Sequence, residues 1–175
     1  MVSLNPFPGS EASGAEDFSL LSGEIVAVRK YSTTFRQWAG APPANTYGNK
    51  AVLDGNGEPV FAELAILRSL EQEGWAGVWA DSFSRQFRIG LLDVPPVELP
   101  DEQANLYESI KQHSQAKHGG CWDVFAWHGD DVLFAELKRK GRDSIRDSQR
   151  AWLEAALAVG VTLDSFVVVE WRVTA

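Results

Sequence analysis

Residues 132–160, VLFAELKRKGRDSIRDSQRAWLEAALAVG, decide the fold that the sequence predicts. The first third is typical of a buried strand, and the apolar spacing of residues 143–159 predicts an amphipathic helix. Three polar side chains interrupt these patterns, since Glu136 and Lys138 lie two apart in the strand and Gln149 falls on the apolar side of the helix. Residues two apart share one face of a strand. A charge on a covered face is unfavourable unless it is paired or bound to a metal, so these positions indicate a polar site built into the core.

The residues just before this stretch predict a partner strand. Residues 121–140 are typical of a hairpin with its turn at 128–131, and both strands are apolar on both faces, as in a sheet covered on two sides. Asp123 and Glu136 then lie on adjacent strands. With antiparallel pairing in the right register the two carboxylates face one point, where their repulsion requires a cation.

The rest of the pattern predicts one mixed α/β domain. Residues 1–20, rich in Gly, Ser, Pro and acids, are expected to be a flexible leader, and residues 21–175 a single domain. Outside the hairpin, we expect strands near residues 24–31 and 165–174, helices near 59–73 and 101–118, and core positions for the aromatic residues Trp79, Phe83 and Phe87. Glu63 lies on the buried stripe of the earlier helix.

Composition limits the classes of protein. The single cysteine, Cys121, excludes an intrachain disulfide and a cysteine-based zinc site. We expect a cytoplasmic protein with no membrane contact, since we find neither a secretion signal nor an apolar run of the ~18 residues that span a bilayer. The net charge of −8 argues against a generally basic DNA-binding surface, yet residues 138–150 hold six basic and two acidic side chains. This strip either collects phosphates or is a solvated helix face.

Two carboxylates at one point make a site for a hard cation such as Mg²⁺ or Mn²⁺. Such an ion can polarise a phosphodiester and activate a water molecule. A lysine beside it, as Lys138 is beside Glu136, can orient that water and counter the charge that develops on phosphorus. The carbonyl of Leu137, between them, is a further candidate ligand.

An ordered set of residues resembles the PD-(D/E)XK nuclease superfamily, which has the restriction-endonuclease-like fold, and is closest to its VRR-NUC branch. The set is Gly120, Asp123, Glu136, Lys138 and Gln149, preceded by a helix that bears Glu63. The resemblance covers about residues 60–172 and leaves an N-terminal extension before them. Trp122 stands where the superfamily motif has proline.

This resemblance implies a central mixed sheet flanked by helices and a Mg²⁺- or Mn²⁺-dependent hydrolase of DNA phosphodiester bonds. Asp123 and Glu136 would be the principal metal ligands, with Glu63 an additional acid. Lys138 would assist water attack, and Gln149 would support the site or contact substrate. The residues expected to contact DNA are Arg139, Lys140, Arg142 and Arg146.

Each of these assignments has an alternative. Glu136 and Lys138 could form an ion pair at the edge of a sheet, and Asp123 could accept backbone N–H bonds in a turn or bulge. Glu63 could simply stabilise the start of its helix, and Gln149 could be a core amide bonded to backbone. The whole chain could be a catalytically silent nuclease-fold module that acts in binding or assembly. The acidic remainder also leaves a second copy of the chain or a partner protein open as a source of positive surface.

Overall fold

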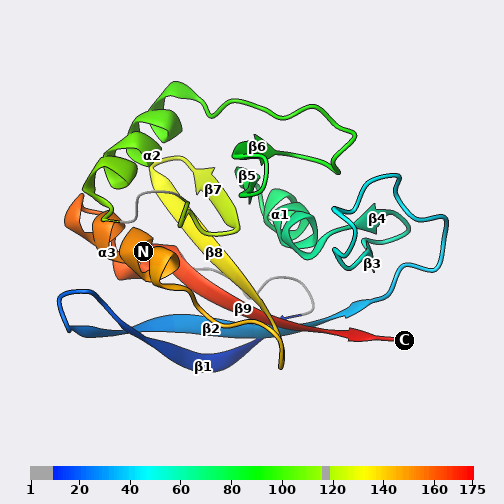
Figure 1. The fold of residues 1–175 in the computed structure, drawn as a ribbon, viewed down its shortest axis with the longest axis horizontal. Coiled ribbons are helices and arrows are strands. Elements are labelled where there is room, and N and C mark those ends of the chain that lie inside the picture. Colours follow the sequence, from blue (N-terminus) through cyan, green and yellow to red (C-terminus); the bar gives the residue numbers. More distant parts are fainter. Residues whose placement is uncertain (1–9, 116–118) are drawn as a thin grey trace.

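The computed structural model describes residues 10–115 and 119–175, and a mixed seven-stranded sheet forms its centre (Figure 1). The order of strands is β1-β2-β9-β8-β7-β5-β6. β2, β9 and β8 run parallel to one another, and the other neighbouring strands are antiparallel. The strands are β1 (Ser10–Ser19), β2 (Ile25–Arg36), β5 (Ala76–Asp81), β6 (Gln86–Arg88), β7 (Val124–His128), β8 (Asp131–Arg139) and β9 (Phe166–Thr174), with β3 (Leu53–Asp54) and β4 (Pro59–Val60) in a separate small ribbon.

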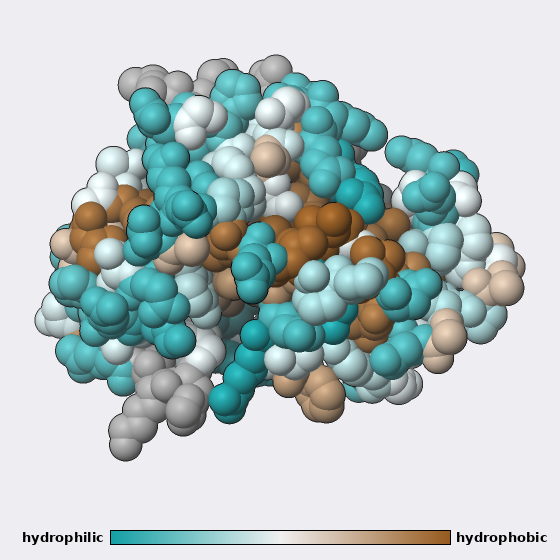
Figure 2. Space-filling view, turned by 90° about the horizontal axis from the view of Figure 1, so that it is seen from above, coloured by the Kyte–Doolittle hydropathy of each residue, from teal (hydrophilic) through white to brown (hydrophobic). Residues whose placement is uncertain are grey.

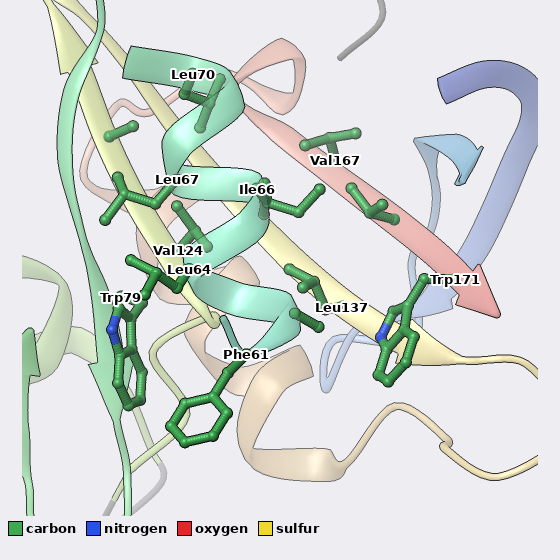
Figure 3. Packing of buried hydrophobic residues seen from close by; sticks show 14 of the residues in the cluster. Phe61, Leu64, Ile66, Leu67, Leu70, Trp79, Val124, Leu137, Val167 and Trp171 are labelled. Carbon is green, nitrogen blue, oxygen red and sulfur yellow. The ribbon is translucent and has the colours of Figure 1, made fainter. Parts of the chain in front are cut away.

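Helices cover both faces of the sheet. They are α1 (Ala62–Gln72), α2 (Asp101–His113) and α3 (Asp147–Ala158), with a 3₁₀ turn at Leu163–Ser165. α1 packs on the face that carries Val124 and Leu137 (Figure 3). α2 and α3 pack on the opposite face, which carries Phe125 and Phe134. The central strands are therefore apolar on both sides, and the expected mixed α/β class with a two-sided sheet is confirmed.

The hairpin that the sequence predicts is present. β7 and β8 pair from Val124 with Ala135 to His128 with Asp131. Gly129 takes a φ of 58° in the connecting turn, a left-handed conformation that favours glycine. The final strand predicted from the sequence is also present as β9, beside β8.

The flexible leader predicted for residues 1–20 is wrong for Ser10–Ser19, which form β1 along the edge of the sheet. Phe18 is only 1% exposed and anchors this strand in the core, while most of its other side chains face solvent. Gly14, with a φ of 94°, lies in an irregularity of the pairing with β2. The composition of an exposed edge strand resembles that of a loop, which explains the error. Residues 1–9 lie outside the described residues.

Two helices begin later than the sequence predicts. α3 begins at Asp147 because Asp143 closes a turn instead: its carboxylate accepts the N–H of Arg139 at 2.8 Å, and its own N–H donates to the Arg139 carbonyl at 3.2 Å. α1 begins at Ala62 because Pro59 belongs to β4, where it pairs in the small ribbon.

The surface is mostly hydrophilic on the face seen in Figure 2, with a band of hydrophobic side chains across its middle. The core positions expected for the aromatic residues are only partly correct, since Trp79 is 1% exposed but Phe83 is 79% exposed. In the described part of the chain, no helix combines the length and the apolar character that crossing a bilayer requires.

Candidate functional site

A cleft of about 700 Å³ opens where the ends of β7 and β8 meet the starts of α1 and α3. It contains every side chain that the sequence singled out as catalytic or metal-binding. These are Glu63, Asp123, Glu136, Lys138 and Gln149, with Leu137 between the strand residues. The structure thus brings together residues that lie up to 86 positions apart in the chain.

The β7–β8 hairpin positions the two acids. Val124 and Ala135 are paired across the hairpin, and Asp123 and Glu136 follow this pair directly at its open end. Asp123 reaches across to β8, where its Oδ2 accepts the backbone N–H of Leu137 at 2.8 Å, so the alternative of a carboxylate that accepts a backbone N–H is present at this residue. The Asp123 carbonyl in turn accepts the N–H of Ala80 at 2.8 Å, which fixes this residue to β5. The carboxylates therefore sit on rigid elements.

Burial and mutual repulsion shift both acids in one direction. Burial raises the pKa of Asp123 to about 7, assisted by the negative charge of Glu63 and opposed by the Leu137 N–H and the charge of Lys50. Burial also raises the pKa of Glu136 well above its usual value, and the charges of Asp123 and Glu63 add to this effect. Acids whose charged form is destabilised in this way gain most from a bound cation.

Gln149 connects α3 to Glu136. Its Nε2 donates to Glu136 Oε1, and its Oε1 accepts the backbone N–H of Arg146 at 2.7 Å. The second bond satisfies a free amide at the start of the helix. The core-amide alternative is therefore present in part, because the same side chain bonds to backbone and orients a cleft acid.

Gly120 allows α3 to approach the hairpin this closely. Its φ is +96°, and a Cβ at this position would overlap the carbonyl oxygen of Ser148. Two residues later, Trp122 is fully buried and its Nε1 donates to the Gln149 carbonyl at 3.1 Å. The start of α3 is therefore held against the segment that carries Asp123.

Lys138 has a partner that the sequence did not reveal. Its Nζ lies 2.5 Å from Oε1 of Glu16, and their side chains are 15% and 22% exposed. Glu16 comes from β1, 122 residues away in the chain, in the stretch expected to be a leader. The sheet-edge ion pair between Glu136 and Lys138, offered as an alternative, is not what forms at Lys138.

Glu63 also has an unexpected partner. It lies in the first turn of α1, and its carboxylate pairs with the ammonium group of Lys50, another residue of the cleft. Lys50 was not singled out from the sequence because it lies in a loop rich in turn residues, where a lone lysine carries no periodic signal.

The four basic residues expected at DNA do not share one location. Arg139, Arg142 and Arg146 line the cleft. Arg139 also lies over the ring of Trp171, at 5.3 Å from the centroid. Lys140 instead lines a smaller hollow between β1, β2 and β9. Three of the four could therefore meet a substrate that enters the cleft.

The donor set suits a hard cation in part. Within residues 10–115 and 119–175, no group of three or more His, Cys, Asp or Glu side chains is arranged as a metal site. However, Oε2 of Glu136 is buried and has no hydrogen-bond partner among the described residues, although the side chain lies beside Asp123. The partly buried carboxylate of Asp123 and the buried carboxylate of Glu136, with its unpartnered oxygen, fit Mg²⁺ or Mn²⁺ if water or substrate supplies the other ligands.

Comparison of the chain with protein families, curated proteins and solved structures gave no match. The functional assignment therefore depends on the geometry of the cleft.

Proposed function

We propose that this chain is a divalent-metal-dependent nuclease that hydrolyses DNA phosphodiester bonds. One observation supports this most directly: the adjacent carboxyls of Asp123, which is partly buried, and Glu136, which is buried, share a cleft with Lys138. Buried acids with raised pKa values are unfavourable in a purely structural role, and such groups concentrate at functional sites.

Each residue has a role in this proposal. Asp123, Glu136 and the Leu137 carbonyl would hold Mg²⁺ or Mn²⁺, which when bound supplies Lewis acidity and an activated water. Lys138 would hydrogen-bond the attacking water or the phosphate. Gln149 orients Glu136 from α3.

Positive groups at the rim of the cleft would receive the DNA backbone. Arg142 and Arg146 are exposed cleft residues, and they carry positive charge in an otherwise acidic protein. Guanidinium groups bind phosphate oxygens well. A substrate phosphate near the acids would therefore meet these side chains.

The arrangement of elements also supports membership of the PD-(D/E)XK superfamily, with the VRR-NUC branch as the proposed relative. The helix with Glu63 precedes β7, which begins directly after Asp123, and β8, which carries Glu136; the helix with Gln149 follows before β9. β1 and β2 would be an N-terminal extension that enlarges the sheet beside this core.

A catalytically silent module is the second candidate. Two observations favour it: the Lys138 ammonium is engaged by Glu16, and the described residues hold no three-donor metal group. Both fit a fold that has kept its charged residues for structure rather than for hydrolysis.

One experiment separates the two candidates. The protein is incubated with Mg²⁺ or Mn²⁺ and a panel of single-stranded, duplex, flapped and branched DNAs, alongside Lys138→Ala and Asp123→Asn. A nuclease cuts at least one substrate, and both variants lose cutting while circular dichroism stays unchanged. If no substrate is cut and titration calorimetry shows no Mn²⁺ binding, the nuclease proposal is rejected.

A further inference from the structure

Lys50 occupies a defined position in the cleft. Its ammonium contacts the Glu63 carboxylate and lies 5.2 Å from the ring centroid of Phe61 and 5.6 Å from that of Trp79. Both rings are almost fully buried, and Figure 3 shows them side by side at the start of α1. A cation held by a carboxylate and two aromatic faces is fixed in place.

The Lys50–Glu63 pair acts on the acids of the hairpin. The negative charge of Glu63 raises the pKa of Asp123 and of Glu136, and the positive charge of Lys50 lowers that of Asp123. Glu63 is thus close enough for an electrostatic interaction with both acids. Even so, no group of three acidic, His or Cys side chains among the described residues is arranged as a metal site. Its carboxylate is committed to Lys50 in this state.

We propose that Lys50 competes with a divalent cation for the Glu63 carboxylate and thereby withholds the third acid of the cleft from the metal. Lys50 offsets part of the negative charge while no metal is bound. For Oε1 of Glu63 to become a ligand, its bond to Lys50 must break, and the ammonium is then free to turn toward a phosphate. This inference rests on the proposed metal site at Asp123 and Glu136.

The test is Mn²⁺ affinity, measured by titration calorimetry on the full chain. Lys50→Met keeps an apolar stem against Phe61 and Trp79 but removes the charge. We expect Mn²⁺ to bind about tenfold more tightly to Lys50→Met, because a charge-assisted bond no longer has to break. In a Glu63→Gln background the same substitution should change the affinity by less than about twofold.

Matched variants separate competition from a general charge effect. Arg142→Met removes the same charge from an exposed cleft residue, and Lys50→Arg keeps the charge at the site. Both should bind Mn²⁺ within about twofold of the unchanged protein. Lys50→Gln serves as a second neutral variant if Lys50→Met fails to fold by circular dichroism.

Three results would overturn the inference: unchanged affinity in the neutral Lys50 variants, a gain that persists with Glu63→Gln, or an equal gain in Arg142→Met. If Asp123→Asn and Glu136→Gln weaken Mn²⁺ binding as expected, these results reject only the role of Lys50. If the unchanged protein binds no Mn²⁺ at all, both the inference and the proposed function fail.

Discussion

Replacing Asp123 with asparagine should stabilise the metal-free protein at alkaline pH. Burial raises the pKa of Asp123 from 3.8 to about 7. At about 1.36 kcal/mol per pKa unit, keeping this carboxyl ionised above pH 7 lowers the free energy of unfolding by roughly 4 kcal/mol. Because the partly buried side chain faces an open cleft, solvent screens about half of this, which leaves about 2 kcal/mol. Asparagine keeps an oxygen to accept the Leu137 N–H and gains an amide that can donate to Glu136.

The sign of the pH dependence follows from the direction of the shift. The native state binds the Asp123 proton more tightly than the unfolded state does. The stability that this proton contributes is therefore complete below about pH 4 and is lost as the pH rises through about 7. Urea unfolding in EDTA should therefore show Asp123→Asn exceeding the unchanged protein by about 2 kcal/mol at pH 8 and by much less at pH 4.5. In a chain of this size the difference corresponds to a rise in melting temperature of about 4–8 °C at pH 8.

The control for this experiment is Asp130→Asn, an exposed carboxyl of the β7–β8 turn, which should leave stability within about 0.5 kcal/mol at either pH. Adding Mn²⁺ should make the unchanged protein more stable than Asp123→Asn, since a ligand at 100 times its Kd adds about 2.7 kcal/mol to the free energy of unfolding of a protein that binds it. An Asp123→Asn protein that is less stable at pH 8, or a difference that does not vary with pH, would refute the reasoning.

Three further substitutions test other parts of the site. Lys138→Ala should keep the fold and reduce DNA cleavage by about 100-fold or more, the scale for a lost electrostatic group; undiminished plasmid nicking would contradict its assigned role. Glu16→Ala should lower the cleavage rate by about three- to tenfold, because a freely rotating lysine is rarely oriented, whereas Glu16→Gln keeps an acceptor and most of the rate; equal rates in both variants would separate β1 from the site. Gly120→Ala should destabilise the protein by about 2–4 kcal/mol in chemical denaturation, through strain and overlap with Ser148, whereas Gly119→Ala, with open space at its Cβ, should have about 1 kcal/mol of effect.

The parts of the fold that the sequence predicts well are those with local, periodic signals. The β7–β8 hairpin has continuous apolar strands and a glycine turn, and both signals act over a few residues. The sequence predicts too early a start for α3 because the helical pattern extends back to Asp143, where a side-chain bond to Arg139 forms a turn instead. Propensity cannot foresee such a local competition between a carboxylate and the helix.

The site is predictable where alternation and helical spacing define a shared face. Asp123 and Glu136 meet because they are the residues next to the paired Val124 and Ala135 at the open end of the hairpin. Gln149 meets Glu136 because it lies on the side of α3 that faces the sheet. Glu16 and Lys50 carry no such signal. Their positions depend on how β1 and the loop before α1 return to the cleft, which is a property of the complete tertiary structure.

The N-terminal segment, residues 10–50, therefore contributes more to the cleft than its composition indicates. It delivers a carboxylate to Lys138 and an ammonium to Glu63, the two groups flanking the hairpin acids. Glu16 offsets the positive charge of Lys138, whereas Lys50 offsets negative charge in a cleft whose central acids repel one another. A divalent cation would take over part of that role. Lys50→Met should thus lower the free energy of unfolding more in EDTA than with saturating Mn²⁺, and urea unfolding under both conditions would measure this difference.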